Sequence, residues 1–393
     1  MLRRITAFAL SASLLALVAC SDDDAAAPSG PEGSAVDAEP TTTEVDATFP
    51  GAQWATADPA EAGFDPAALD ALSAEAEAAD SGCLAVVRDG ELVLDEGWGP
   101  GQVGEPRQAF SVTKSITSVL TGIAQDAGDL SIEQPAADFI PEWADTPADV
   151  VTVHDLLANA SGREWSLALD YRDMAVQAAD KTQFGIDLEQ TSPPGEVWAY
   201  NNSAIQTLSA VLEEATGQPA TDLAAEQLLE PIGMADSTMT TDASGGTLTF
   251  MGLQTTCQDL ARFGHLMLHD GSWDGEQVVA AEYVQQATGE PSTDLVDNYG
   301  LLFWLNRTGR MASPAIATAA TGATTETETQ PETDGQMVPT APDDTFWALG
   351  FQEQIVAVIP SEGIVAVRMG TKPPAEAPFT YAELTEGVLE ALA

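Results

Sequence analysis

The sequence predicts an α/β fold: an antiparallel sheet built from both termini and flanked by helices, plus a mainly helical subdomain. Three observations indicate this. Residues 83–98, CLAVVRDGELVLDEGW, contain two apolar runs separated by Asp89-Gly90, a pair that favours a tight hairpin turn. Residues 346–370 contain further runs that are typical of strands. The long segment between them has mainly the apolar periodicity of helices.

The individual elements follow in chain order. Residues 66–79 have helical spacing, and residues 111–127 form a helix with an apolar face. Five further helical stretches are predicted: 152–159, 202–216, 219–229, 256–270 and 280–287. Three segments then carry the alternation of strands, and a helix closes the chain: NYGLLFWLN at 298–306, FWALGFQEQIVAVIP at 346–360, GIVAVRMG at 363–370 and the helix at 381–393. Residues 308–345, rich in Ala, Thr, Pro and Glu, are predicted to be a low-complexity insertion in a hairpin loop.

Three parts are predicted along the chain. Residues 1–19 combine a basic start with an apolar run too short to span a bilayer, and LVAC ends at Cys20. This tetrapeptide resembles the lipobox of bacterial lipoproteins, in which the cysteine carries a lipid; an ordinary secretory signal is the alternative. Residues 20–50 are predicted to be an acidic disordered tether, and 51–393 the folded domain. We expect a lipid-anchored protein of the cell envelope, outside the cytoplasm.

The charge balance is strongly acidic. The chain has 62 acidic and 13 basic residues, a formal net charge of −49. Such a surface repels phosphate backbones, so nucleic-acid binding is not expected. Because the acidic residues are spread along the whole chain, we interpret them as a solvation device.

Two cysteines remain once Cys20 is assigned to the lipid. Outside the cytoplasm Cys83 and Cys257 can pair in a disulfide. Two free buried thiols are the alternative, because spacing along the chain does not give distance in space.

A Ser-x-x-Lys motif stands at the start of the predicted helix 111–127. Only three lysines occur in the chain, and one of them, Lys114, follows Ser111 by three residues. Residues i and i+3 lie on one face of a helix. Burial lowers the pKa of a lysine, and the resulting neutral amine can take the proton of a serine hydroxyl. The free N–H groups of a helix start can stabilise an oxyanion.

Further motifs accompany this one, including Tyr-x-Asn at 200–202 after SPPGEVW. Over roughly residues 53–390 the chain resembles the penicillin-binding-protein-like serine hydrolases, which include class C β-lactamases, esterases of that fold and 6-aminohexanoate-dimer hydrolases. The blocks that carry the resemblance occur in the family's order: FSVTKSITSVLTGIAQDAGDLSIEQPAADFIPE, VTVHDLLANASGREW, PPGEVWAYNNSAIQTLSAVLEEATG and GLQTTCQDLARFGHLMLHDGSWDGEQVV. The resemblance implies a β-lactamase/transpeptidase-like fold.

The resemblance also assigns roles by position. It makes Ser111 the acylated nucleophile and Lys114 its proton acceptor. Tyr200 would be a partly ionised phenol that passes protons to the leaving group and from the deacylating water. Asn202 would orient Lys114 or the substrate carbonyl.

The third family element differs in this chain. Where the family has a Lys- or His-containing triad that ends in glycine, residues 348–350 are Ala-Leu-Gly. In β-lactamases and peptidases of this fold that cation helps hold the substrate carboxylate, so its absence argues against both activities. The esterase and aminohexanoate-dimer branch is more similar, including the spacing of Gly350 and Gln354. By analogy, the backbone N–H of Phe351 and that of Ser111 form the oxyanion hole.

The resemblance implies a serine hydrolase that cleaves small-molecule esters or amides through an acyl-enzyme at Ser111, with no cofactor. Two alternatives stay open: a catalytically silent protein that binds envelope components, and a β-lactamase or D-alanyl carboxypeptidase. The intact Ser111, Lys114 and Tyr200 argue against the silent binder.

The three histidines give no competing site. No Gly-x-Ser-x-Gly motif accompanies them, as a Ser-His-Asp hydrolase of that type would require. His265 and His269 have the i, i+4 spacing of metal ligands, but neither the glutamate of a metalloprotease nor a third ligand is evident. We therefore predict no metal site, and interpret His154 as structural.

Overall fold

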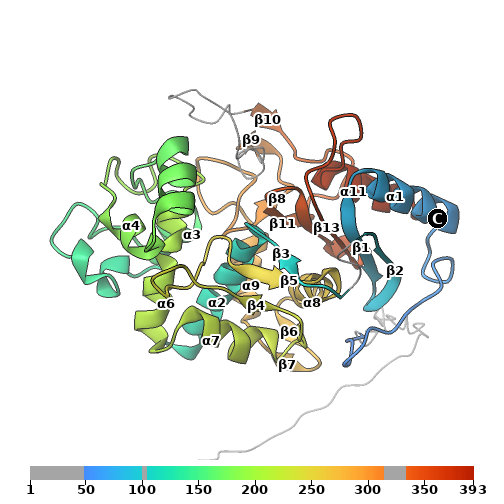
Figure 1. Cartoon of the computed structure of the whole chain (residues 1–393), viewed down its shortest axis with the longest axis horizontal. Helices are drawn as coiled ribbons and strands as arrows, with labels where there is room; N and C mark the ends of the chain where they lie inside the picture. The colour runs from blue at the N-terminus through green and yellow to red at the C-terminus, as the bar shows by residue number, and fades with distance from the viewer. Residues whose placement is uncertain (1–47, 100–103, 314–332) are drawn as a thin grey trace, which may run out of the picture. The chain divides into compact units, whose positions relative to one another are not determined.

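The computed structural model describes residues 48–99, 104–313 and 333–393 (Figure 1). The predicted signal segment 1–19, the lipidation residue Cys20 and the predicted tether up to residue 47 lie outside these ranges. No helix within the described ranges is long and apolar enough to cross a membrane.

A central antiparallel sheet contains strands from both the N-terminal and the C-terminal ends of the domain. Within the described residues its strand order is β2-β1-β13-β12-β11-β8. The strands are β1 (Ser81–Arg88), β2 (Glu91–Gly97), β8 (Trp304–Leu305), β11 (Phe346–Gly350), β12 (Gln354–Ile359) and β13 (Ile364–Gly370). The N-terminal hairpin thus pairs with the last strand, which confirms the prediction of a sheet built from both termini.

The sequences of these strands explain their positions. Strands β12 and β13 are buried along their whole length, as expected for central strands covered on both faces. The turn between β1 and β2 has Asp89 at φ 49° and Gly90 at φ 84°, both in the left-handed region that a type I′ hairpin requires. The predicted hairpin is therefore correct.

Helices cover both faces of the sheet (Figure 1). Helices α1 and α11 lie side by side on one face, and α8 packs on the other. In the middle of α8, Gly264 allows close approach, since a Cβ there would lie 2.4 Å from Val365 Cγ1. The helices in the described ranges are α1 (Pro66–Ala78), α2 (Val112–Ala127), η1 (Ala136–Asp138), η2 (Pro141–Trp143), α3 (Val153–Leu157), η3 (Ala168–Gln177), α4 (Lys181–Asp187), α5 (Asn202–Gln206), α6 (Leu208–Thr216), α7 (Ala220–Ala224), η4 (Ala225–Leu229), α8 (Cys257–Leu268), α9 (Ala281–Thr288), η5 (Pro360–Glu362) and α11 (Tyr381–Glu390).

The mainly helical subdomain predicted for the middle of the chain runs from α3 to η4, with α2 between it and the sheet (Figure 1). It includes α4 and the π-helix η3, neither of which was predicted. Three small sheets complete the described structure: β3 (Arg107–Gln108), β5 (Leu253–Thr255) and β4 (Thr238–Met239); β6 (Ser272–Trp273) and β7 (Glu276–Gln277); β9 (Gly309–Met311) and β10 (Thr333–Gly335).

Several predicted elements are divided. The predicted helix 202–216 is split into α5 and α6 near Thr207, whose Oγ1 donates a hydrogen bond to the Ala204 carbonyl. The predicted strand at 346–360 is interrupted after Gly350 by a turn in which Gln352 and Glu353 have positive φ. The segment 298–306 contributes only the short β8.

The flanks of the predicted insertion 308–345 are folded. Strands β9 and β10 pair with each other across it. Val338 is buried, and its N–H donates to the Asn306 side chain over 2.9 Å. Only residues 314–332 of the predicted insertion lie outside the described ranges.

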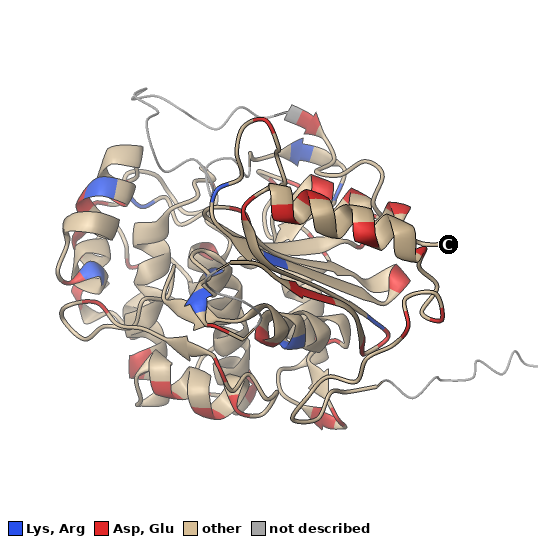
Figure 2. Ribbon diagram, turned by 45° about the vertical axis from the view of Figure 1, so that its right-hand side comes forward, with Lys and Arg blue, Asp and Glu red and all other residues tan. Residues whose placement is uncertain are grey.

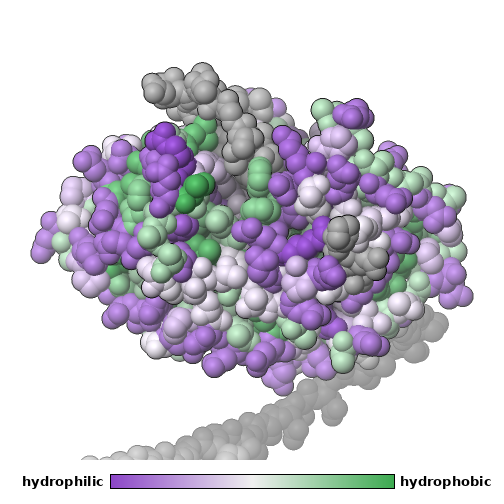
Figure 3. All heavy atoms as spheres, viewed as in Figure 1, coloured by the Kyte–Doolittle hydropathy of each residue, from purple (hydrophilic) through white to green (hydrophobic). Residues whose placement is uncertain are grey.

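Charged groups are distributed as the sequence suggested. Figure 2 shows acidic residues distributed along the ribbon throughout the described domain, with few basic residues among them. The face in Figure 3 is largely hydrophilic, with hydrophobic side chains interspersed. This distribution fits a solvation role for the acidic residues.

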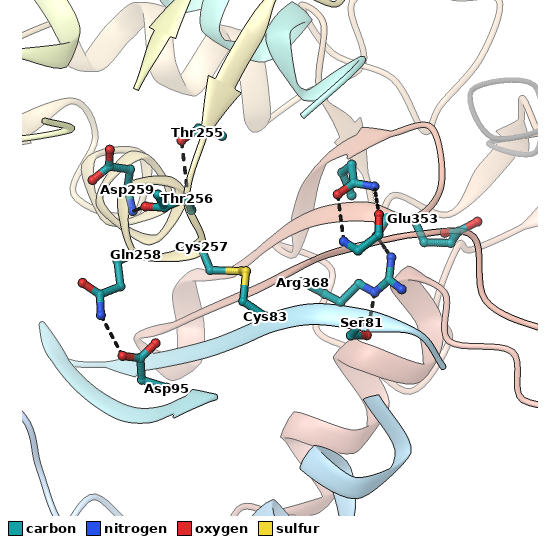
Figure 4. The surroundings of a disulfide bond; sticks show 12 residues. Ser81, Cys83, Asp95, Thr255, Thr256, Cys257, Gln258, Asp259, Glu353 and Arg368 are labelled. Atoms are coloured by element: carbon teal, nitrogen blue, oxygen red, sulfur yellow. Dashed lines mark hydrogen bonds between the residues drawn. A yellow bond between two sulfur atoms is a disulfide. The ribbon is translucent and has the colours of Figure 1, made fainter. Parts of the chain in front are cut away.

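A disulfide joins the two layers of the domain. Cys83 in β1 and Cys257 at the start of α8 are bonded, with their Cα atoms 6.2 Å apart (Figure 4). Next to this bond, Gln258 Nε2 donates to Asp95 Oδ2 on β2 over 2.7 Å. Of the two alternatives for these cysteines, the structure has the disulfide.

Reduction of the Cys83–Cys257 disulfide should lower the free energy of unfolding by about 2–4 kcal/mol, because the bond restricts the unfolded chain over a sequence separation of 174 residues. Guanidinium unfolding followed by tryptophan fluorescence, with and without reductant, measures this. The Cys83→Ala/Cys257→Ala double variant should show the same loss and no further response to reductant. An unchanged midpoint on reduction would contradict the prediction.

Candidate active site

The start of α2 brings Ser111 and Lys114 together. Ser111 is the N-cap residue of this helix, and Lys114 lies one turn further on. Lys114 Nζ is 2.8 Å from Ser111 Oγ. The preceding residue, Phe110, has φ 48°, a strained conformation for a bulky residue, and its carbonyl accepts a hydrogen bond from Thr113 Oγ1. Strain of this kind is often found at functional sites.

Lys114 is almost completely enclosed, with 1% of its surface exposed. Nζ also donates to the Phe250 carbonyl over 3.0 Å and lies 4.8 Å from the centre of the Tyr200 ring. Burial lowers the pKa of Lys114 to about 7, and the negative charge of Asp170 opposes part of this shift. A substantial fraction of this amine is therefore neutral at neutral pH.

Tyr200 closes the site from the helical subdomain. Its ring stacks on Trp304, with centroids 5.9 Å apart, and its hydroxyl hydrogen-bonds to the Ser111 side chain. Burial raises the pKa of Tyr200, and the hydrogen bond with Ser111 opposes this only in part. Tyr200 is thus a neutral phenol at neutral pH, which corrects the expectation of a partly ionised one: the same exclusion of water that neutralises the lysine disfavours a phenolate.

Asn202 contacts a carboxylate that the sequence did not single out. Its Nδ2 donates to Asp170 Oδ2 over 2.7 Å, and its side chain is hydrogen-bonded to Tyr171. Asp170 lies on η3, and its pKa is raised by burial, with the hydrogen bonds from Ser203 and Asn202 opposing the shift. The structure therefore holds Asn202 through Asp170. The only sequence signal for Asp170 is an acidic residue after the apolar run of SLALDY.

The end of β11 lies directly beside the serine. A Cβ on Gly350 would come within 2.3 Å of the Ala109 carbonyl oxygen and 3.2 Å of the Ser111 nitrogen, so only glycine fits. The ring of Phe351 packs edge-on against Phe110, with centroids 5.3 Å apart. The structure thus brings Gly350 and Phe351 to the backbone of Ser111.

Two buried polar side chains fix the turn that follows Phe351. Gln354 Nε2 donates to the Phe351 carbonyl over 3.0 Å, and Arg368 Nη1 donates to the Gln352 and Glu353 carbonyls over 2.6 and 2.9 Å. These bonds fix the positions of the three carbonyls in the turn. Figure 4 shows Arg368 reaching toward this turn.

The histidines have other surroundings. His265 is buried on α8, where its Nε2 lies 2.9 Å from the Thr48 carbonyl and its ring contacts that of Phe49. His269 is its ring neighbour, with centroids 4.4 Å apart. The described residues contain no group of three or more His, Cys, Asp or Glu side chains that could hold a metal ion.

A family model described as Beta-lactamase matches residues 69–388, more than half of the chain. The chain belongs to the beta-lactamase family. Its fold is that of this family: a putative 6-aminohexanoate-dimer hydrolase from Bacillus anthracis superposes with a TM-score of 0.64 at 20% identity, covering 81% of this chain and 80% of that one.

Two curated members of the family are similar in sequence. The 6-aminohexanoate-dimer hydrolase of Paenarthrobacter ureafaciens is 24% identical over 237 residues, which cover 55% of this chain and 59% of the relative. Penicillin-binding protein 4 of Amycolatopsis lactamdurans is 31% identical over 164 residues, which cover 39% of this chain and 43% of the relative. The chain thus spans about half the length of these relatives.

Replacing Lys114 by Met should change how stability depends on pH. The unfolded chain keeps the lysine protonated up to about pH 10.5, whereas the folded protein releases the proton near pH 7. The stability linked to Lys114 is therefore fully present above about pH 10.5 and is lost as the pH falls towards 7. Relative to Lys114→Met, the unfolding free energy of the wild type should rise with pH across this window, by up to about 1.4 kcal/mol per pH unit.

Chemical denaturation at several pH values between about 7 and 10 measures this difference. The matched control is Lys372→Met, which makes the same substitution at an exposed lysine. A flat difference for Lys114→Met would show that burial does not neutralise this amine.

Proposed function

We propose that this beta-lactamase family member is a serine hydrolase that cleaves ester or amide bonds through an acyl-enzyme on Ser111. The observation that carries the proposal is the 2.8 Å contact between Ser111 Oγ and a buried lysine amine whose pKa is about 7. The names of the relatives, a hydrolase and a penicillin-binding protein, support the same class of chemistry.

In the proposed reaction, neutral Lys114 takes the proton of Ser111 as Oγ attacks the substrate carbonyl. The oxyanion that forms is bound by the backbone N–H groups of Ser111 and Phe351, beside Gly350. As the tetrahedral intermediate collapses, Tyr200 gives its proton to the leaving group and receives the one held by Lys114. A water molecule then attacks the acyl-enzyme, and the same groups return Ser111 to its hydroxyl form.

The substrate class follows from the strand beside the serine. Residues 348–350 are buried and carry no cation to pair with a substrate carboxylate. We therefore propose uncharged small-molecule esters or amides as substrates. A β-lactamase or D-alanyl carboxypeptidase activity and a silent envelope-binding role are the alternatives, and a panel of short esters, amides, nitrocefin and D-Ala-D-Ala peptides separates all three.

A fluorophosphonate probe should label the wild-type protein on Ser111, and p-nitrophenyl acetate should be hydrolysed at a rate that rises with pH to a plateau, with a midpoint near pH 7. The rise follows from the neutral fraction of Lys114, because only the unprotonated amine accepts a proton. Mass spectrometry locates the label, and Ser111→Ala should abolish both signals. Lys114→Met should lower turnover by several orders of magnitude. Absence of labelling in folded wild-type protein would favour the silent binder.

We also propose that the protein is anchored outside the cytoplasm by a lipid on Cys20. The support is the tetrapeptide LVAC after an apolar run and two arginines, together with a disulfide of the kind that persists in oxidising compartments.

Cys20→Ser should move the protein from the membrane fraction to the soluble fraction of the envelope, because it removes the thiol that carries the lipid. Cell fractionation and metabolic labelling with a radioactive fatty acid measure this. Cys83→Ala is the matched control and should stay in the membrane fraction. A Cys20→Ser protein that still sediments with membranes would contradict the anchor.

A further inference from the structure

Asp170 is a completely buried carboxylate, with 0% of its surface exposed. Within the described residues, its hydrogen bonds come from neutral groups of Asn202 and Ser203, and none comes from a lysine or arginine. Burial of an ionised carboxylate without a directly bonded cation is costly, so it calls for a specific compensation. Here the cost is offset by hydrogen bonds from Asn202 and Ser203, next to the proposed active site.

Four hydrogen bonds converge on this carboxylate, two on each oxygen. Oδ2 accepts from the backbone N–H and the side-chain amide of Asn202, over 3.1 and 2.7 Å. Oδ1 accepts from the backbone N–H and the hydroxyl of Ser203, over 2.7 and 2.6 Å. All four donors belong to two consecutive residues at the start of α5. These four bonds favour the ionised carboxylate and so oppose burial, which raises the pKa of Asp170.

These bonds fix the segment that presents Tyr200. Tyr200 precedes Asn202 by two residues, so the backbone that Asp170 holds is the backbone that carries the phenol. From the other side, the Asn201 N–H donates to Asn159 Oδ1 over 3.1 Å. The segment from Tyr200 to Ser203 is thus held between η3 and the end of α3. The Tyr200 hydroxyl at its start is directed to Ser111.

The charge of Asp170 affects the pKa values of three nearby groups: Lys114, Tyr171 and Tyr200. Lys114 on α2 carries the opposite charge, and Tyr200 and Tyr171 are the phenols. Asn202 and Ser203 on α5 are neutral donors. Lys114 is the one cation in this group, so a negative charge on Asp170 favours the protonated form of this amine inside a site closed to water.

We propose that Asp170 is a positioning residue for the hydrolysis, which fixes the backbone segment that carries Tyr200 and Asn202 and contributes a buried carboxylate to the proposed active site. This rests on the proposed hydrolase function. The same carboxylate has two effects in this proposal. It fixes the position of the segment that carries Tyr200, and its charge raises the pH at which Lys114 loses its proton.

The test compares Asp170→Asn with Ser203→Ala. Asp170→Asn keeps the size of the side chain but removes the charge and turns one acceptor into a donor that faces other donors. We expect kcat for p-nitrophenyl acetate to fall about 10²-fold with little change in KM, because the phenol is misplaced. We also expect the midpoint of the pH–rate profile to move below that of the wild type, because loss of a nearby negative charge lowers the pKa of a lysine.

Ser203→Ala removes one of the four hydrogen bonds and leaves the charge, so it should lower kcat less and leave the pH midpoint in place. A lower kcat for Asp170→Asn with an unmoved midpoint would mean that Asp170 is only structural. If Asp170→Asn does not fold, Asp170→Glu takes its place. It keeps the charge but displaces it, so kcat should fall while the midpoint stays within the wild-type range, and an unchanged kcat overturns the proposal.

A second measurement is independent of turnover. The free energies of unfolding of the wild type, Asp170→Asn, Lys114→Met and the double variant form a cycle that isolates the coupling of the two side chains. The coupling should be favourable at about pH 6, where the lysine is protonated, and much smaller at about pH 9. Absence of coupling at both pH values overturns the proposal for Asp170, whereas failure of the probe to label wild-type Ser111 overturns the hydrolase function instead.

Discussion

The site depends on the burial of one amine. Lys114 is placed by the first turn of α2, enclosed by the rings of Tyr200 and Phe250, and kept within hydrogen-bond distance of Ser111. Exclusion of water lowers the affinity of this amine for its proton, and the same exclusion keeps the Tyr200 phenol neutral. A single environment thereby favours a neutral amine and a neutral phenol near one hydroxyl, as the proposed base and acid require.

The enclosed surroundings of Lys114 require the sheet and the helical subdomain to pack closely around the start of α2. The sheet contributes the end of β11, where Gly350 lets a strand meet the backbone of Ser111. The helical subdomain contributes Tyr200, through a segment fixed by Asp170. The buried residues Gln354 and Arg368 hold the turn after Phe351 from behind. Most of these supports are hydrogen bonds to backbone groups, which set the position of the chain without adding charge at the serine.

The sequence predicted what local patterns determine. The hairpin at Asp89-Gly90 and the Ser-x-x-Lys spacing follow from short-range rules and agree with the structure. The pairing of both chain ends in one sheet, which the order of predicted strands and helices indicated, also agrees with it. The role of Asp170 was not predictable, because its donors lie more than 30 residues away and are brought to it only by tertiary packing. The ionisation of Tyr200 was expected wrongly for a related reason: burial is a property of the whole fold.

The disulfide between Cys83 and Cys257 has a topological consequence. The chain between these residues contains α2 and the whole helical subdomain, including Ser111, Lys114 and Tyr200. The disulfide joins its two ends, one in β1 and the other at the start of α8. This part of the protein is a covalently closed ring. A protease that cuts it once, anywhere between the two cysteines, leaves both fragments joined, so that the nicked protein keeps Ser111 on the same molecule until the bond is reduced.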